Sequence, residues 1–164
     1  MDYPMKQKWP IFLALLLLMS TSACNAVLSE QVRSTANEET LFEEIFEDPK
    51  QHVGKIIILG GEVLRLQYKG QQTEVEFAEI PLYRTGKPAL GFDPGEHFFV
   101  IFPYRVDETL LKKGKVITVA GRVIGTHNVR GFDYPLFAYE EAYVWDKLRQ
   151  DRFPSYGAFL GQSS

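Results

Sequence analysis

Two stretches of the chain repeat one pattern of Gly, Lys and β-branched residues at an offset of 60 positions. The first stretch covers residues 54–63 and the second covers residues 114–123, with Gly61 and Gly121 at the same place in each. A Gly inside an apolar strand marks a bulge, a sharp bend or a close approach of another segment. The repeat therefore predicts two long, bent strands that lie next to each other, as a small curled barrel requires.

Strand-like sequence dominates the chain after Pro49, because β-branched and aromatic runs alternate there with Gly and Pro. The order of these runs favours a mainly β fold, a small OB-like five-stranded barrel, and a β-sandwich is the main alternative. The expected strands are residues 55–66, 73–80, 96–102, 115–125 and 135–145, with a hairpin turn at residues 68–71 and a short helical turn at residues 107–113.

One short helix is expected before the strands, over residues 38–47. Asn37 can cap its start, and Glu38 and Glu39 place carboxylates in the first turn, where the helix dipole favours them. Pro49 marks its end.

The N-terminus has the pattern of an export signal that ends at Cys24, the only Cys of the chain. Lys6 and Lys8 precede an apolar run over residues 11–19, which is too short to span a bilayer. The small residues before Cys24 resemble a bacterial lipobox, which implies cleavage before Cys24 and acylation of its thiol and new amine. An ordinary secretory signal with a free thiol is the alternative.

These observations divide the chain into four expected parts. They are a lipoprotein signal peptide over residues 1–23, a flexible polar tether over 24–36, the OB-like barrel domain over 37–148, and a C-terminal tail over 149–164. The tail is apolar and interrupted by Gly and Pro, so we expect it either to pack on the barrel or to contact a partner or the membrane.

The charge of the chain argues against a nucleic-acid partner. The formal net charge is −3, whereas nucleic-acid binders carry a positive surface that neutralises phosphates. Membrane attachment is therefore expected to come from the lipid on Cys24, since more than one acyl chain gives stable anchoring.

Several motifs, in order, resemble the Slp-type outer-membrane lipoproteins, a family named for a starvation-inducible member. The resemblance implies an outer-membrane location, a lipid anchor and an envelope role linked to stress or stationary phase, and it supplies no catalytic residues. The motifs are the lipobox at Cys24, Val53-Gly54-Lys55, Gly60-Gly61-Glu62-Val63, Thr73-Glu74-Val75-Glu76, Ile80-Pro81-Leu82, Ile117-Thr118-Val119-Ala120-Gly121, Tyr134-Pro135 and Tyr143-Val144-Trp145.

Asn25 follows the expected lipidated residue and is the candidate sorting residue. In many Gram-negative lipoproteins an Asp at this place retains the protein in the inner membrane. Asn25 carries no carboxylate, so we expect the protein in the outer membrane, on its periplasmic face.

The sequence shows no metal-ligand spacing, nucleophile elbow or phosphate loop, so we expect no enzyme activity, no catalytic residue, no metal and no cofactor. A hydrolase with an unrecognised site is the less favoured alternative. The titratable candidates are His52, His97 and His127 at the ends of elements, and Glu74, Glu76, Glu79, Glu140 and Glu141, which we interpret as solvated surface.

Aromatic residues gather on the expected third and fifth strands. Most should fill the barrel, and the remainder could form a flat face that binds glycan, because OB-like barrels bind oligosaccharides on one strand face. An envelope protein or a glycan is therefore the expected partner besides membrane lipid, and the sequence does not identify the ligand-binding residues.

Overall fold

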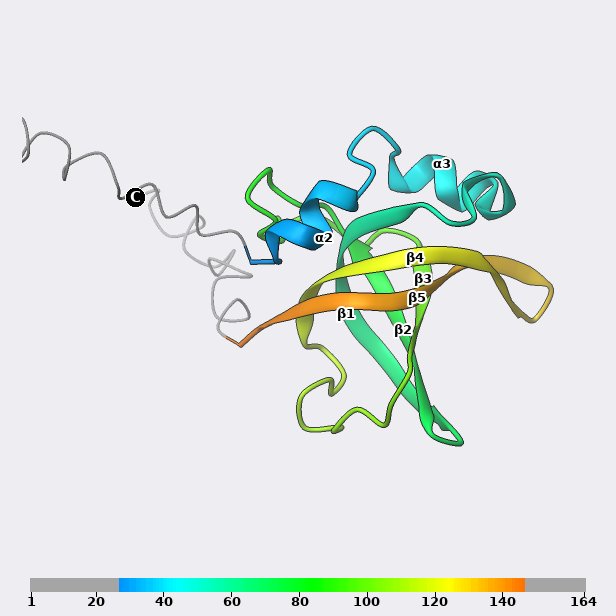
Figure 1. Ribbon diagram of the computed structural model, residues 1–164. Coiled ribbons are helices and arrows are strands. Elements are labelled where there is room, and N and C mark those ends of the chain that lie inside the picture. Colours follow the sequence, from blue (N-terminus) through cyan, green and yellow to red (C-terminus); the bar gives the residue numbers. More distant parts are fainter. Residues whose placement is uncertain (1–26, 147–164) are drawn as a thin grey trace, which may run out of the picture.

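The computed structural model describes residues 27–146, which form a closed barrel of five strands with short helices packed beside it (Figure 1). The expected mainly β, OB-like barrel is confirmed. The helical segments are α2 (Glu30–Thr35), α3 (Phe42–Glu47) and the 3-10 helix η1 (Pro49–His52), and the strands are β1 (Ile56–Lys69), β2 (Gln72–Ile80), β3 (His97–Phe102), β4 (Val116–Val129) and β5 (Phe132–Trp145).

The strand order around the barrel is β1-β2-β3-β5-β4, and β4 closes it by pairing with β1. β3 and β5 run parallel, whereas the other neighbouring strands are antiparallel. The two repeat stretches lie side by side, with Ile57 opposite Gly121 and Gly61 opposite Ile117. The expected adjacency of the first and fourth strands is therefore confirmed, and closure excludes the sandwich.

The barrel interior is filled by alternate residues of each strand, because successive side chains of a strand point to opposite faces. Phe77 of β2 stacks on Phe98 of β3 with ring centroids 5.2 Å apart, and Phe98 meets Phe137 of β5 edge-on at 5.8 Å. All three rings are fully buried. Burying a side chain of this size stabilises the fold by about 1.5–3 kcal/mol.

Gly61 and Gly121 are needed because the barrel packs closely around them. A Cβ at Gly121 would lie 2.8 Å from Phe137 Cβ, and one at Gly61 would lie 2.9 Å from Phe98 Cζ. The strand irregularities are near both positions but coincide with only one. The register shifts between Ala120 and Gly121 on β4, whereas on β1 it shifts between Val63 and Arg65.

Four strands, β1, β2, β4 and β5, extend beyond the predicted bounds. β4 was expected to end at Gly125, but this Gly sits beside a register shift and the strand continues to Val129. The reversal occurs instead at Arg130 and Gly131, which both have positive φ. The β1–β2 hairpin likewise turns at Gly70 and Gln71, later than the predicted start of the turn.

The helix predicted over residues 38–47 begins later, at Phe42, with Leu41 in the N-cap position. Asn37 does not cap it, because its Oδ1 accepts from the backbone N–H of Thr40 at 2.8 Å and of Glu39 at 3.2 Å. These bonds form a turn, and the Asn37 N–H donates to Ile56 O on β1. The prediction of the cap is therefore wrong.

The flexible tether predicted over residues 24–36 is wrong where the structure describes it. Leu28 is buried, α2 spans Glu30–Thr35, and Ala36 forms a bridge with Ile56. Ser29 holds α2 to β5, since its Oγ donates to Glu141 Oε2 at 2.6 Å and its N–H donates to Glu141 Oε1 at 3.0 Å. Polar composition predicted flexibility, but these tertiary contacts order the segment.

Candidate functional site

The two site residues predicted by number, Cys24 and Asn25, lie outside the described residues, as does the predicted tail over residues 149–164. The first residue that the structure describes, Val27, lies against the loop between β2 and β3: a Cβ at Gly86 would lie 3.1 Å from Val27 Cγ2. The chain therefore enters the fold immediately after the expected lipidation site.

The three histidines each contact a different charged group. His52 Nδ1 lies 3.1 Å from Lys55 Nζ, His97 Nδ1 lies 3.0 Å from Glu76 Oε1, and His127 Nδ1 lies 3.3 Å from Glu74 Oε2. Within residues 27–146 no group of three or more His, Cys, Asp or Glu side chains is arranged to hold a metal ion.

Glu74 and Glu76 point away from the barrel interior, but their interpretation as solvated surface is wrong. Glu74 is only 6% exposed and pairs with Lys69 at 2.8 Å as well as with His127. Glu76 is half-buried and pairs with Arg65 at 3.2 Å. The cause is the β4–β5 hairpin, which brings His127 over this face of β2.

The same hairpin covers the outer face of β3, where a glycan-binding face was expected. Phe99 points outward but is only 1% exposed, because the His127 ring stacks on it at 4.2 Å and the Tyr134 ring lies 5.9 Å away. His97 also stacks on Tyr134, at 5.8 Å. These rings are used in packing, so this face offers no open aromatic surface.

Glu79 has an unusual titration for a carboxyl group. Burial is the main cause and the nearby Glu43 carboxylate the second, and together they raise the pKa of Glu79 to about 7. Glu140 and Glu141 differ from it because each has a polar partner: Glu140 pairs with Arg122 at 2.8 Å and Glu141 accepts from Ser29. The five carboxylates singled out from the sequence thus have separate environments.

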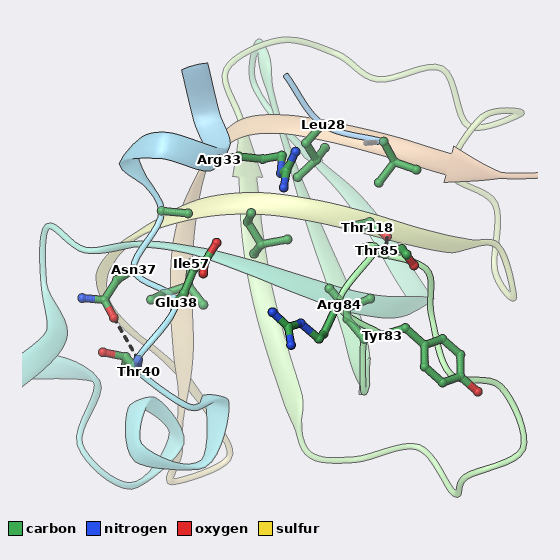
Figure 2. A pocket seen from close by; sticks show the side chains of 15 residues that line it. Leu28, Arg33, Asn37, Glu38, Thr40, Ile57, Tyr83, Arg84, Thr85 and Thr118 are labelled. Carbon is green, nitrogen blue, oxygen red and sulfur yellow. Dashed lines mark hydrogen bonds between the residues drawn. The ribbon is translucent and has the colours of Figure 1, made fainter. Parts of the chain in front are cut away.

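A pocket of about 480 Å³ opens between α2, the loop after it, the start of β1, β4, and the loop over residues 82–86 (Figure 2). Its charged lining residues are Arg33 of α2, Arg84 of the loop and Glu38. The remaining lining residues are Val27, Leu28, Ala36, Asn37, Thr40, Ile57, Ile58, Leu82, Tyr83, Thr85, Gly86 and Thr118.

The walls of this pocket are held by hydrogen bonds between distant parts of the chain. Thr118 Oγ1 on β4 donates to Gly86 O at 2.7 Å and accepts from Trp145 Nε1 at 2.9 Å. The loop itself is a hydrogen-bonded turn, since Gly86 N–H donates to Tyr83 O at 2.8 Å and Tyr83 N–H donates to Lys87 O at 2.9 Å. These hydrogen bonds therefore fix the walls of the pocket relative to each other.

Sequence reasoning missed Arg33 and Arg84. They are 51 residues apart in the chain and lie in segments with no motif, so only the fold brings them to one pocket. The one available signal was the Tyr83-Arg84-Thr85-Gly86-Lys87 segment, whose Gly marks a turn and whose basic residues would be exposed on it.

The helices in the described part of the chain lack the length and apolar character needed to cross a membrane. Two solved structures are similar in part. One is an OBody (AM3L09) bound to hen egg-white lysozyme, with a TM-score of 0.43, 19% identity, and coverage of 66% of this chain and 96% of that one. The other, from Leishmania major Friedlin, is assigned as an aspartyl-tRNA synthetase, with a TM-score of 0.40, 10% identity, and coverage of 66% and 22%.

No curated protein matched the chain. The class of the protein follows from its strand order: it is a small, closed, five-stranded β-barrel with a pocket at the end where the chain enters. The outer membrane lipoprotein Slp family matches residues 21–160, which is most of the chain. The chain therefore belongs to this family, and it is a lipid-anchored protein of the outer membrane.

Proposed function

We propose that the protein is a non-enzymatic binding or structural component of the cell envelope, held at the periplasmic face of the outer membrane by lipid on Cys24. Its working site in this proposal is the pocket lined by Arg33, Arg84 and Glu38. A link to stress or stationary phase is part of the proposal and follows from the family resemblance alone.

The observation that carries the proposal is the distance between this pocket and the expected anchor. Val27 lines the pocket, and only Asn25 and Ala26 separate it from Cys24. Consecutive Cα atoms lie 3.8 Å apart, so three steps of chain span at most about 11 Å. A lipid on Cys24 would thus hold the pocket end of the barrel at the membrane surface.

The polar groups of the pocket suit binding better than catalysis. The hydroxyl of Thr40 accepts from Lys55 Nζ at 3.0 Å, and the hydroxyl of Thr118 is held between Gly86 and Trp145. A nucleophile needs a base that accepts its proton, whereas the Thr40 hydroxyl accepts from an ammonium group and the Thr118 hydroxyl donates to a backbone carbonyl. The guanidinium groups of Arg33 and Arg84 are binding groups.

Site-specific photo-crosslinking in intact cells tests the proposal. A benzophenone-bearing amino acid replaces Tyr83 at the pocket, and in a matched control it replaces Phe132 on the β4–β5 hairpin, where the side chain is 71% exposed. We expect a discrete crosslinked product from the Tyr83 position and none from Phe132. Products that are equal at the two positions, or missing from both, contradict a binding role for the pocket.

A further inference from the structure

The pocket carries a net positive charge within a chain of net negative charge. Arg33 and Arg84 line it together with one carboxylate, Glu38. Arg84 forms no ion pair with any residue in the 27–146 range, and the partner of Arg33, Glu30, is exposed and lies 3.6 Å away. An exposed pair at that distance contributes about 0–1 kcal/mol, so both guanidinium groups are available to a ligand.

The two guanidinium groups reach the pocket from different elements. Figure 2 shows Arg33 extending from α2 on one side, Arg84 from the loop on the other, and Glu38 from the segment that joins α2 to α3. α2 is fixed to β5 by Ser29 and Glu141, and the loop is fixed by its own hydrogen bonds. The backbone segments that carry the two arginines are therefore fixed before a ligand arrives.

The exposed residues around the pocket are of a type that contacts lipid headgroups. Tyr83 lines the pocket and is 56% exposed, and Tyr143, opposite Thr118 in the β4–β5 ladder, is 44% exposed. Tyr is enriched at membrane–water interfaces because its ring is apolar and its hydroxyl is polar. Lys55 is not a lining residue, but its Nζ donates to the hydroxyl of the lining residue Thr40 at 3.0 Å.

We propose that this pocket binds the headgroup of a membrane phospholipid with a phosphate and an ammonium group, of the phosphoethanolamine type. The phosphate lies between Arg33 and Arg84, and the ammonium group lies toward Glu38. This inference rests on the proposed function, because the lipid anchor is what brings the pocket to the leaflet.

The chemistry of the three charged groups selects this ligand. Arginine forms paired, charge-assisted hydrogen bonds with phosphate oxygens. A headgroup that carries only negative charge would meet repulsion from Glu38, whereas an ammonium group gives Glu38 an opposite charge. A neutral glycan would leave both guanidinium groups and the carboxylate without charged partners.

Calorimetric titration of the full mature chain in detergent micelles tests the inference. The probes are dihexanoyl-phosphatidylethanolamine, dihexanoyl-phosphatidylglycerol and inorganic phosphate. We expect Arg33→Gln and Arg84→Gln each to weaken binding of the first probe about tenfold, the size of one charge-assisted hydrogen bond. Glu38→Gln should weaken binding of the ethanolamine lipid but not binding of the glycerol lipid.

Arg130→Gln is the matched control, because Arg130 lies at the turn of the β4–β5 hairpin and should leave binding unchanged. Wild-type affinity in both pocket variants, or no binding of either lipid, overturns the inference. Inorganic phosphate that binds as tightly as the ethanolamine lipid would show a free-phosphate site and overturn the lipid assignment. A glycan or protein captured at Tyr83 in cells would support the proposed function and overturn this inference.

Discussion

Gly61 and Gly121 determine how closely the aromatic core can approach β1 and β4. Each lies so close to an atom of a Phe side chain that an added Cβ would clash with it. Neither is among the glycines with positive φ. The requirement is therefore steric and not conformational. A larger side chain must displace Phe98 or Phe137, both of which are fully buried.

Gly121→Val should lower the free energy of unfolding by about 1–3 kcal/mol, the usual cost of overpacking a core. The reason is the 2.8 Å separation from Phe137 Cβ, an atom that cannot move without the backbone of β5. Urea denaturation measures the change. Ile124→Val, at an exposed position of the same strand, is the control and should change stability by a few tenths of a kcal/mol. An unchanged midpoint for Gly121→Val would contradict the packing described for β4 and β5.

Glu79 destabilises the fold as the pH rises. Its pKa is about 7 in the folded protein and 4.5 as a free side chain, so the unfolded chain ionises first. Below pH 4.5 the group is neutral in both states and costs nothing. Between pH 4.5 and 7 ionisation of Glu79 favours the unfolded state, so the free energy of unfolding falls. Above pH 7 the full destabilisation by the buried carboxylate is present.

Glu79→Gln should therefore stabilise the protein at pH 8 and leave it unchanged at pH 4. We expect a gain of about 1–2 kcal/mol at pH 8, since solvent screens a partly exposed group. Urea denaturation at the two pH values measures it, with Glu96→Gln as an exposed control. A gain of equal size at both pH values would show that ionisation is not the cause.

At the scale of elements, periodicity predicted the strands because each one buries alternate residues. His97–Phe102 has strictly alternating inward Phe98, Val100 and Phe102, and the prediction for this strand differs from the structure by one residue. The adjacency of the first and fourth strands also followed from the Gly-containing repeat. Local sequence is therefore sufficient to predict a strand wherever the strand buries only one of its faces.

The ordering of α2 and the cover over β3 could not be predicted from local sequence. α2 is six residues long and has no buried residue, so contacts distant in sequence hold it, above all the bond between Ser29 and Glu141. The stack of His127 on Phe99 likewise joins two strands through the curl of a hairpin. The pocket depends on the ordering of α2, because Arg33 lies on that helix and Arg84 on a distant loop, which is why its arginines were missed.

Ser29 and Glu141 should show energetic coupling that controls the order of α2. Ser29→Ala and Glu141→Gln each remove hydrogen bonds between them, so the double variant should cost about 1 kcal/mol less than the sum of the single variants. Hydrogen exchange at the backbone amides of α2 should become faster in each single variant. Glu140→Gln, which breaks the pair with Arg122, is the control and should leave α2 exchange unchanged. Additive costs would contradict the contact.

At the scale of the whole molecule, the described segment begins and ends on one side of the barrel (Figure 1). Val27 lines the pocket there, and Trp145 at the end of β5 bonds to the pocket residue Thr118. A lipid attached just before Val27 therefore orients the entire barrel. The β4–β5 hairpin extends from the opposite side in Figure 1 and would point away from the anchor.

The anchor itself is tested by mass spectrometry and fractionation. The mature protein should begin at Cys24 with added acyl mass, and Cys24→Ala should abolish both cleavage before residue 24 and acylation. Asn25→Asp should move the protein from the outer to the inner membrane on a density gradient, because the new carboxylate supplies a retention signal. Identical gradients for wild type and Asn25→Asp would contradict the sorting role of Asn25.

The orientation of the barrel at the membrane is the central claim, and fluorescence quenching by lipids that carry a spin label on the headgroup tests it most directly. Once Cys24 is acylated the chain has no other thiol, so Tyr83→Cys and Phe132→Cys each give one labelling site. In nanodiscs that hold the lipidated protein, the account predicts strong quenching at position 83 and little at position 132. Equal quenching at the two positions, or stronger quenching at 132, would contradict it.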